Sequence, residues 1–414
     1  MTTAERQRNA QELIRPQLPA ELSKREGRCP FDPATALTEL SGRGRIHKIE
    51  HNGDTVWLVT GHDEARAVLA EPKMSADRIN SPRAKALISP ELHAEMFPPE
   101  RQAGSFIFMD APEHTRFRRL LTGQFTVRRM RDLTPRIHEI VTTHLDAMIE
   151  KGPPADLVHD FALPVPSLVI CELLGVDYGD RDEFQRRTAT LLSLTTTVDE
   201  QIKNSGELRR FMQSLVREKK RNPGDDLLSG LVRDTDLTEN ELAGIANLLL
   251  IAGHETTANM LALGTFALLE HPDQLAKLRD DPELTENAVE ELLRYLSIIS
   301  MGVARHAKED VVIGGATIRA GETVVVSVPA VNRDQGQYED PHELLVDRPR
   351  GHHVAFGHGI HQCLGQQLAR VEMTVGFTEL LRRLPTLRLA VPAEEVPLRT
   401  DMSIYGVHKL PVTW

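Results

Sequence analysis

The sequence predicts a mainly α-helical protein with a minor β component, folded as one large domain. Helical periodicity extends with few interruptions from residue 112 to residue 296, and β-prone runs occur only near the two ends of the chain. The 414 residues, 40% of them hydrophobic and 26% charged, can bury a large core. The first residues are polar, so we expect a polar, partly flexible segment over residues 1–28. No shift in composition marks a later boundary, so we expect a single domain over residues 29–414.

Two strands joined by a tight turn are the first predicted elements. Residues 46–50 and 55–60 are β-prone, and the Asn52-Gly53 pair between them is typical of a hairpin. A short helix is expected over residues 63–69. Residues 81–102 contain several breakers and little periodicity, which predicts a long loop with at most one short helix.

Prolines and glycines divide the helical region, and strand character returns after it. Breaks are expected at Pro153-Pro154, Pro164, Asn222-Pro223-Gly224 and Pro272. Strands are expected over residues 310–313, 317–318 and 323–328, around a turn at Gly314-Gly315.

The longest predicted helix occupies the middle of the chain. Thr238 and Glu241 have the spacing of a capping box and His271-Pro272 ends the apolar pattern, which gives a helix of about 32 residues, roughly 48 Å long. At its centre, AGHETT at 252–257 interrupts the apolar residues. Because a Thr hydroxyl competes for the carbonyl one turn earlier, this segment favours a local widening with room for a ligand or water. A simple bend in a buried helix is the alternative.

A single cysteine near the C-terminus is the most distinctive residue. Cys363 lies in FGHGIHQCLG at 356–365, between glycines and directly before an apolar helical pattern. The positive end of a helix favours a thiolate at such a position. Local chemistry leaves three roles open, namely a nucleophile, a zinc ligand or a haem ligand, although the nearby histidines fit no standard tetrahedral zinc spacing.

Two pairs of polar residues have the spacing of neighbours on a helix. Glu291 and Arg294 are three residues apart, so a carboxylate can fork onto a guanidinium. His114 and Arg118 are four residues apart and form a donor pair suited to carboxylates. Each pair alone is more typical of a solvated helix face.

Composition disfavours several classes of partner and location. A formal net charge of −11 argues against a nucleic-acid partner. No stretch reaches the roughly eighteen uninterrupted apolar residues of a membrane span, so we expect no such span. Cys29, Cys171 and Cys363 are widely and irregularly spaced, which favours a reducing compartment, with the cytoplasm as the expected location.

Taken in order, these motifs resemble those of the cytochrome P450 family of haem-thiolate monooxygenases. The loop at 356–365 resembles the haem-binding signature of the family, AGHETT its oxygen-activation motif, and Glu291-Leu292-Leu293-Arg294 its ExxR motif. Residues 110–118 resemble the helix that contacts the haem propionates. The resemblance runs from about residue 29 to the end and is strongest to soluble bacterial, particularly actinobacterial, members. It implies the triangular fold of the family, with haem between the central helix and the cysteine loop.

The resemblance also implies the cofactor and the residues that hold it. Haem b (iron protoporphyrin IX) would have Cys363 as its axial iron ligand, and O2 would be the co-substrate. Gly357 and Gly359 would let the backbone approach the porphyrin closely. The other expected haem-binding residues are His114, Arg118, Arg305 and His361 at the propionates, together with Ala252 and Phe356.

Catalytic and structural roles follow from the same resemblance. Glu255 and Thr256 would relay protons during oxygen activation. Glu291 and Arg294 would be structural and would anchor the cysteine loop. After Asp340-Pro341, the family often has Arg-Phe-Asp where this chain has Glu-Leu-Leu at 343–345. The third partner of the Glu291–Arg294 pair is therefore open, with Arg348 or Asn332 as substitutes.

Position in the family indicates where the substrate would bind. The segments concerned are rich in Leu, Ile, Met and Phe, which favours a lipophilic small molecule such as a macrolide or other polyketide, a terpenoid or a steroid, hydroxylated or epoxidised. Arg78, Arg83 and Arg101 lie in or near these segments, and we expect them to face solvent. Binding an acidic group is the alternative. The pocket candidates are Phe108, Leu249, Ile298, Ile299, Val303 and Ile404.

Electrons are expected from separate proteins, because one such domain fills the chain. The resemblance implies a ferredoxin and a ferredoxin reductase that passes on NAD(P)H-derived electrons, and a monomeric enzyme. A group of arginines is expected near the cysteine side of the haem, where its outward-facing members would steer an acidic ferredoxin, with a solvated helix face as the alternative. The group consists of Arg116, Arg118, Arg119, Arg128, Arg129 and Arg131.

Two other functions stay open. One is a haem-thiolate protein that binds ligands or uses peroxide without O2-dependent monooxygenation, and the other is a helical binding protein without haem. Glu255 and Thr256 favour the monooxygenase, since a sensor has no need of a proton relay.

Overall fold

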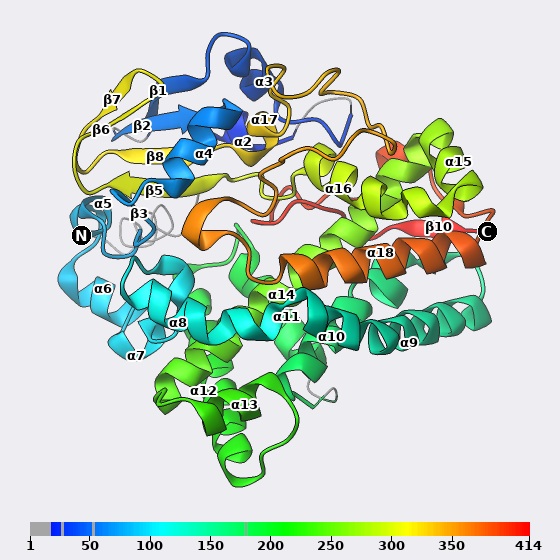
Figure 1. Cartoon of the computed structure of the whole chain (residues 1–414), viewed down its shortest axis with the longest axis horizontal. Coiled ribbons are helices and arrows are strands. Elements are labelled where there is room, and N and C mark those ends of the chain that lie inside the picture. The colour runs from blue at the N-terminus through cyan, green and yellow to red at the C-terminus, as the bar shows by residue number, and fades with distance from the viewer. Residues whose placement is uncertain (1–17, 26–28, 52–53, 178, 180) are drawn as a thin grey trace.

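Helices form most of the molecule, and the strands gather mainly at one side of it (Figure 1). The computed structural model describes residues 18–25, 29–51, 54–177, 179 and 181–414. The longer helices are α4 (His62–Ala70), α8 (Glu113–Thr122), α9 (Val127–Lys151), α10 (Pro164–Leu174), α11 (Arg181–Leu192), α12 (Val198–Arg221), α13 (Leu227–Asp234), α14 (Glu239–Glu270), α15 (Pro272–Asp280), α16 (Thr285–Leu296) and α18 (Gln366–Arg383). The shorter ones are α2 (Ala20–Ser23), α3 (Thr35–Ser41), α5 (Pro82–Leu87), α6 (Pro90–Met96), α7 (Pro99–Gln102) and α17 (Val328–Val331).

The largest sheet has the strand order β1-β2-β8-β5-β3, in which β2 and β8 run parallel and the other pairs are antiparallel. Its strands are β1 (Ile46–His51), β2 (Asp54–Val59), β3 (Met74–Ser75), β5 (Val303–Ala307) and β8 (Thr323–Val326). The smaller sheets comprise β6 (Val311–Ile313) with β7 (Ala316–Ile318), and β4 (Ala155–Asp156) with β10 (Pro411–Thr413) and β9 (Arg388–Leu389). The predicted hairpin and C-terminal strands are confirmed, although the hairpin turn at residues 52–53 lies outside the described residues.

Alternation along the strands gives the large sheet two buried faces. Val324 and Val326 pack with Val59 in one cluster, whereas Val325 packs on the other face. Leu18 and Leu22 are buried in this second cluster. Of the segment over residues 1–28, expected to be partly flexible, residues 18–25 therefore include two core side chains, and the rest lies outside the described residues.

The expected loop over residues 81–102 is instead three short helices, α5, α6 and α7. Each begins with a proline, and two are capped by serines: Ser81 accepts a hydrogen bond from the amide of Ala84, and Ser89 from that of Leu92. Ser-Pro is a helix-start signal, because the serine caps an amide and proline lacks the N–H that the first turn leaves free. The predicted loop is wrong because proline, which breaks a helix in its interior, starts one at its first turn.

The helical core is built around α14, which has the predicted 32 residues and the predicted capping box of Thr238 and Glu241. Helices α10, α12, α16 and α18 pack against it, and it crosses the middle of the molecule (Figure 1). The other predicted breaks are confirmed, with Pro164 starting α10 after a π-helical turn over Val158–Ala162. A helix of this length can carry residues from solvent to the centre of the domain, where the candidate site lies.

Candidate functional site

Cys363 lies at the end of a loop that precedes α18 and folds back on itself. The amide of Cys363 donates to the carbonyl of Phe356 at 2.8 Å, and Gly357 and Gly359 have positive φ angles of 71° and 72°. A Cβ on Gly357 would meet no atom within 4 Å, so this glycine borders open space. A Cβ on Gly359 would lie 2.4 Å from the Leu69 carbonyl oxygen. Gly359, expected at the porphyrin, thus lets the loop pack on α4.

Some surroundings of Cys363 favour its neutral thiol, and others favour the thiolate. Burial raises the pKa of the Cys363 thiol, whereas the amide of Gly365 and the charges of Arg118 and Arg370 lower it. The first residue of α18 is Gln366, so the positive end of this helix lies close to the sulfur. A bound metal ion would deprotonate the thiol outright, and these donors would then stabilise the thiolate.

Four cationic or imidazole groups converge beside the cysteine loop. The rings of His114 and His361 lie 4.1 Å apart, Arg118 donates to the carbonyl of Gln362, and the charge of Arg305 acts on both histidines. Burial, followed by the charge of Arg305, lowers the pKa of His361 to about 3. We call His114, Arg118, Arg305 and His361 the cradle.

Among the described residues, no carboxylate forms a hydrogen bond with the cradle. His114 is 1% exposed, yet neither of its ring nitrogens has a hydrogen-bond partner. Asp110 is within electrostatic range, but its carboxylate accepts hydrogen bonds from the Ala76 amide and from Lys308. Buried ring nitrogens without a partner are typical of a site whose ligand is absent. Two carboxylates, such as the propionates of haem, would supply the missing acceptors, so the residues present fit the group that the sequence implies.

One side of α14 stays accessible although the helix crosses the core. Leu248, Ala252 and Thr256 are spaced by four residues and are exposed or half-buried, whereas most of their neighbours are buried. The Thr256 hydroxyl donates to the carbonyl of Ala252 at 2.9 Å, as its position predicted. The helix is continuous here, so the expected widening is absent from its backbone. Gly253 instead allows close packing, since a Cβ there would lie 2.8 Å from Ile170.

Glu255 lies on a different side of α14 from Thr256. It is 3% exposed, and its carboxylate is 3.0 Å from the guanidinium of Arg399. Both residues line a recess of about 580 Å³ to which α11, α14 and the C-terminal segment contribute. Arg399 is a site residue that the motifs did not indicate, because nothing in its local sequence marks it. Leu248, also missed, could have been found from its helical spacing to Ala252.

The Glu291–Arg294 pair is buried and fully engaged. Arg294 donates to both carboxylate oxygens of Glu291, at 2.7 and 2.8 Å. Arg348 donates to Glu291 at 3.1 Å, and the carbonyl of Asn332 accepts from Arg294 at 2.9 Å. Arg348 is therefore the third charged partner, while Asn332 contributes its backbone and not its side chain.

The pocket candidates divide by exposure. Phe108, Ile299 and Val303 are half-buried, as lining residues should be, whereas Leu249, Ile298 and Ile404 are buried within the main core cluster. The amide of Tyr405 donates to the carbonyl of Ile298 at 2.9 Å, which joins two of the predicted segments.

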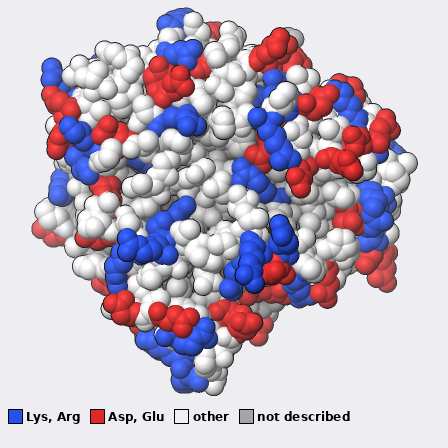
Figure 2. Space-filling view, in the orientation of Figure 1, with Lys and Arg blue, Asp and Glu red and all other residues white. Residues whose placement is uncertain are grey.

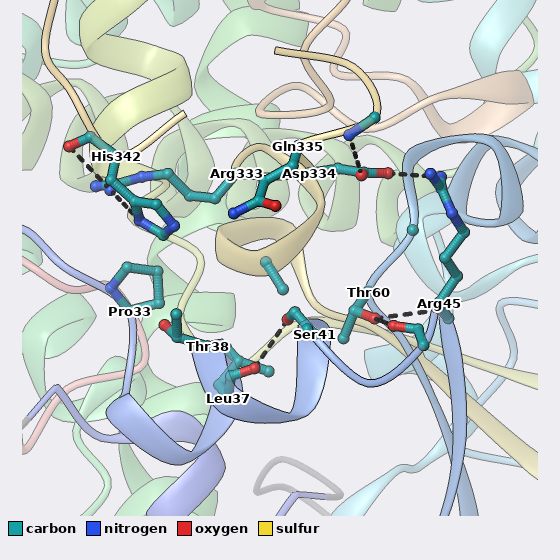
Figure 3. A pocket seen from close by; sticks show the side chains of 15 residues that line it. Pro33, Leu37, Thr38, Ser41, Arg45, Thr60, Arg333, Asp334, Gln335 and His342 are labelled. Carbon is teal, nitrogen blue, oxygen red and sulfur yellow. Dashed lines mark hydrogen bonds and ion pairs between the residues drawn. The ribbon is translucent and has the colours of Figure 1, made fainter. Parts of the chain in front are cut away.

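A separate hollow of about 310 Å³ lies beside α3 and the segment after α17, where Arg45 pairs with Asp334 (Figure 3). None of the predicted site residues lines it. In the described part of the chain, no three His, Cys, Asp or Glu side chains are placed to hold a metal ion, and no described helix is long and apolar enough to cross a membrane.

The comparisons with known proteins agree on one family. The family model described as cytochrome P450 matches residues 183–411. Cytochrome P450 105C1 of a Streptomyces species is 51% identical over 93% of this chain and 96% of its own. Pentalenic acid synthase of Streptomyces avermitilis is 46% identical, with 93% and 95% covered. The crystal structure of CYP105P1 in complex with filipin I superposes with a TM-score of 0.88 at 42% identity, covering 96% of this chain and 99% of that one. The cysteine loop, the cradle and the central helix are all present in this chain. It therefore belongs to the cytochrome P450 family and is a haem-thiolate monooxygenase of lipophilic molecules.

Proposed function

We propose that this enzyme holds haem b between the Cys363 loop and the accessible side of α14. The orphaned ring nitrogens of His114, beside His361 and Arg305, are the observation that carries the assignment. Cys363 would bind the iron, and the cradle would hold the propionates through charge-assisted hydrogen bonds. Open space at Gly357 and accessible surface at Ala252 leave room for a flat ring system. When bound, haem supplies reductive activation of O2, which an axial thiolate favours.

Protons would reach the site through the residues on two sides of α14. Glu255 lines the recess and can collect protons from solvent, while the neighbouring Thr256 is accessible on the other side. The Thr256 hydroxyl donates its hydrogen bond to the Ala252 carbonyl, so its oxygen is free to accept a hydrogen bond from water. Glu255 would thus supply protons and Thr256 would order the water that carries them.

The substrate is proposed to be a macrolide or other polyketide, a terpenoid or a steroid-like molecule. The names of two relatives support this range, since one is a pentalenic acid synthase and another binds filipin I. Half-buried Phe108, Ile299 and Val303 offer an apolar lining with few polar contacts. Hydroxylation or epoxidation is the expected reaction.

Electrons are proposed to come from a ferredoxin and its reductase. Arg119, Arg128 and Arg131 are exposed on α8 and α9, and no described acidic side chain pairs with them, whereas Arg116 is engaged by Glu241 and Asp236. On the face of the molecule in Figure 2, charges of both signs are interspersed. An acidic partner would therefore have to recognise a local group of arginines, since the net charge of the enzyme is −11.

The assignment is tested by the spectrum of the reduced protein under carbon monoxide. The purified enzyme is expected to be red and to give the red-shifted Soret band of thiolate ligation. Cys363→His should give an imidazole-type band instead, because the axial ligand controls the electron density at the iron. A colourless protein, or an imidazole-type band from the unaltered enzyme, would contradict the proposal.

A further inference from the structure

Three arginines near the substrate region differ in their partners. The Nε of Arg83 pairs with Asp54 at 2.6 Å, and Arg101 donates to the carbonyl of Met96 and to the hydroxyl of Ser205. No described residue accepts a hydrogen bond from the guanidinium of Arg78. Of the three, only Arg78 therefore keeps its donors available for a ligand.

Arg78 is exposed, as expected from the sequence, although protein also surrounds its guanidinium closely. Its guanidinium lies over the ring of Phe108, 4.7 Å from the centroid, and burial lowers the pKa of Arg78. The residue nevertheless has accessible surface. A side chain that is close to many protein atoms and still exposed borders a recess in the surface. Contact with the Phe108 ring restrains the guanidinium and leaves its N–H groups without a described acceptor.

The segment around Arg78 is joined to the cradle and to α14. Asp110, just before α8, accepts a hydrogen bond from the Ala76 amide at 2.9 Å, and the ring of Phe106 lies 6.3 Å from that of His114. Gly104 packs against α14 so closely that a Cβ there would lie 2.2 Å from the Glu241 carbonyl oxygen. The turn that carries Phe108 is therefore fixed beside both the cradle and the central helix.

Charge balance leaves Arg78 without a counter-ion even when haem is bound. Burial lowers the pKa of Arg305 to about 10, and the charge of Arg78 acts in the same direction, so these two cations are within electrostatic range. Arg118 and Arg305 match the two propionates in charge, and no described carboxylate forms an ion pair with Arg78 or contributes to its pKa shift. A guanidinium that is partly desolvated and has no paired carboxylate favours an acidic ligand here.

We propose that Arg78 binds a carboxylate of the substrate and that this enzyme prefers lipophilic acids to neutral molecules of the same shape. The inference rests on the proposed haem site, because the substrate must lie between that site and Phe108. A planar guanidinium with free edges can bind a carboxylate through two parallel hydrogen bonds. The acid group would orient the molecule, and its apolar part would lie against Phe108 and the side of α14 that carries Ala252.

The test uses the haem-loaded full chain and three pairs of ligands. Dodecanoic, abietic and 4-phenylbenzoic acids are each titrated beside their methyl esters at neutral pH, and binding is followed by the displacement of water from ferric iron. We expect at least one acid to bind about tenfold or more tightly than its ester, as a charge-assisted hydrogen bond gives in a partly desolvated site. Arg78→Gln should abolish the preference and leave the affinity for the ester unchanged. Arg78→Lys should keep part of it.

The matched control is Arg83→Gln, which removes a cation of the same segment that already has a partner in Asp54. It should retain the full preference for the acid. The proposal is overturned if no acid binds better than its ester, or if Arg78→Gln weakens acid and ester equally. It is also overturned if Arg78→Gln loses haem, because Arg78 would then belong to the cradle. Failure of the haem assignment itself is recognised separately, by the carbon monoxide spectrum of the unaltered enzyme.

Discussion

The Glu291 cluster and the cradle both contain buried basic groups, but among the described residues only the first pairs them directly with a carboxylate. Arg294 is 2% exposed and donates five hydrogen bonds, to Glu291 and to three carbonyls. His114 is 1% exposed and has none at its ring. A cluster whose polar atoms are all hydrogen-bonded stabilises the fold, whereas a cluster with unpaired polar atoms can bind a ligand. This contrast separates structural from ligand-binding polar groups in a chain where both are buried.

Breaking the Glu291 cluster should give the largest effect. Glu291→Gln leaves Arg294 and Arg348 without their carboxylate, so the free energy of unfolding should fall by about 3–5 kcal/mol. Urea unfolding followed by far-UV circular dichroism measures this for the apo and haem-loaded protein, and both should lose the same amount. Glu286→Gln is the control on the same helix, because its pair with Arg350 is exposed and worth less than about 1 kcal/mol. A loss confined to the haem-loaded form would assign Glu291 to the haem site.

A mutation in the cradle should instead weaken haem binding without destabilising the apo protein. His114→Phe removes orphaned donors, so the unfolding free energy of the apo protein should not fall, while haem should be lost about tenfold to a hundredfold more readily. Haem transfer to apomyoglobin measures the second quantity. If the variant destabilised the apo protein and kept its haem affinity, His114 would be a structural residue like Arg294.

The Glu255–Arg399 pair lies between these extremes. Its ion pair joins Oε2 of Glu255 to Arg399 without hydrogen-bond geometry, and the Nε of Arg399 also has no hydrogen-bond partner among the described residues. If Arg399 positions Glu255, Arg399→Gln should lower product formed per electron pair on the order of tenfold and raise peroxide, which is less than the loss of a proton donor itself. The thiolate spectrum should stay unchanged, and Arg399→Lys should restore part of the coupling. Equal coupling in all three proteins would exclude a role for Arg399 in proton delivery.

The smallest effect is expected at the surface. Arg128→Glu with Arg129→Glu adds negative charge where a ferredoxin is proposed to dock, so the KM for an acidic ferredoxin should rise several-fold at low salt and much less at high salt. Turnover measured at several ionic strengths gives both numbers. Arg116→Gln is the control, because Glu241 and Asp236 already engage that side chain. An unchanged salt dependence would place the docking surface elsewhere.

Local patterns predicted most of the elements and the order of the motifs. The capping box and closing proline of α14 depend on residues three or four apart, so the sequence contains all the information they need. The three helices over residues 82–102 were missed because Ser-Pro signals both a turn and a helix start. Gly359 was expected to make room for the porphyrin, yet it makes room for α4, and Gly253 makes room for α10, which only packing reveals.

The sequence by itself determined the helical core, the cysteine loop and the family, because these depend on short-range spacing and on motifs in a fixed order. Only the tertiary structure decided which cations have partners. Arg78, Arg83 and Arg101 are alike as residues on one segment, yet their surroundings differ, since Asp54 and Ser205 come from distant parts of the chain. Whether a charge is satisfied depends on contacts that folding creates, and local sequence does not contain them.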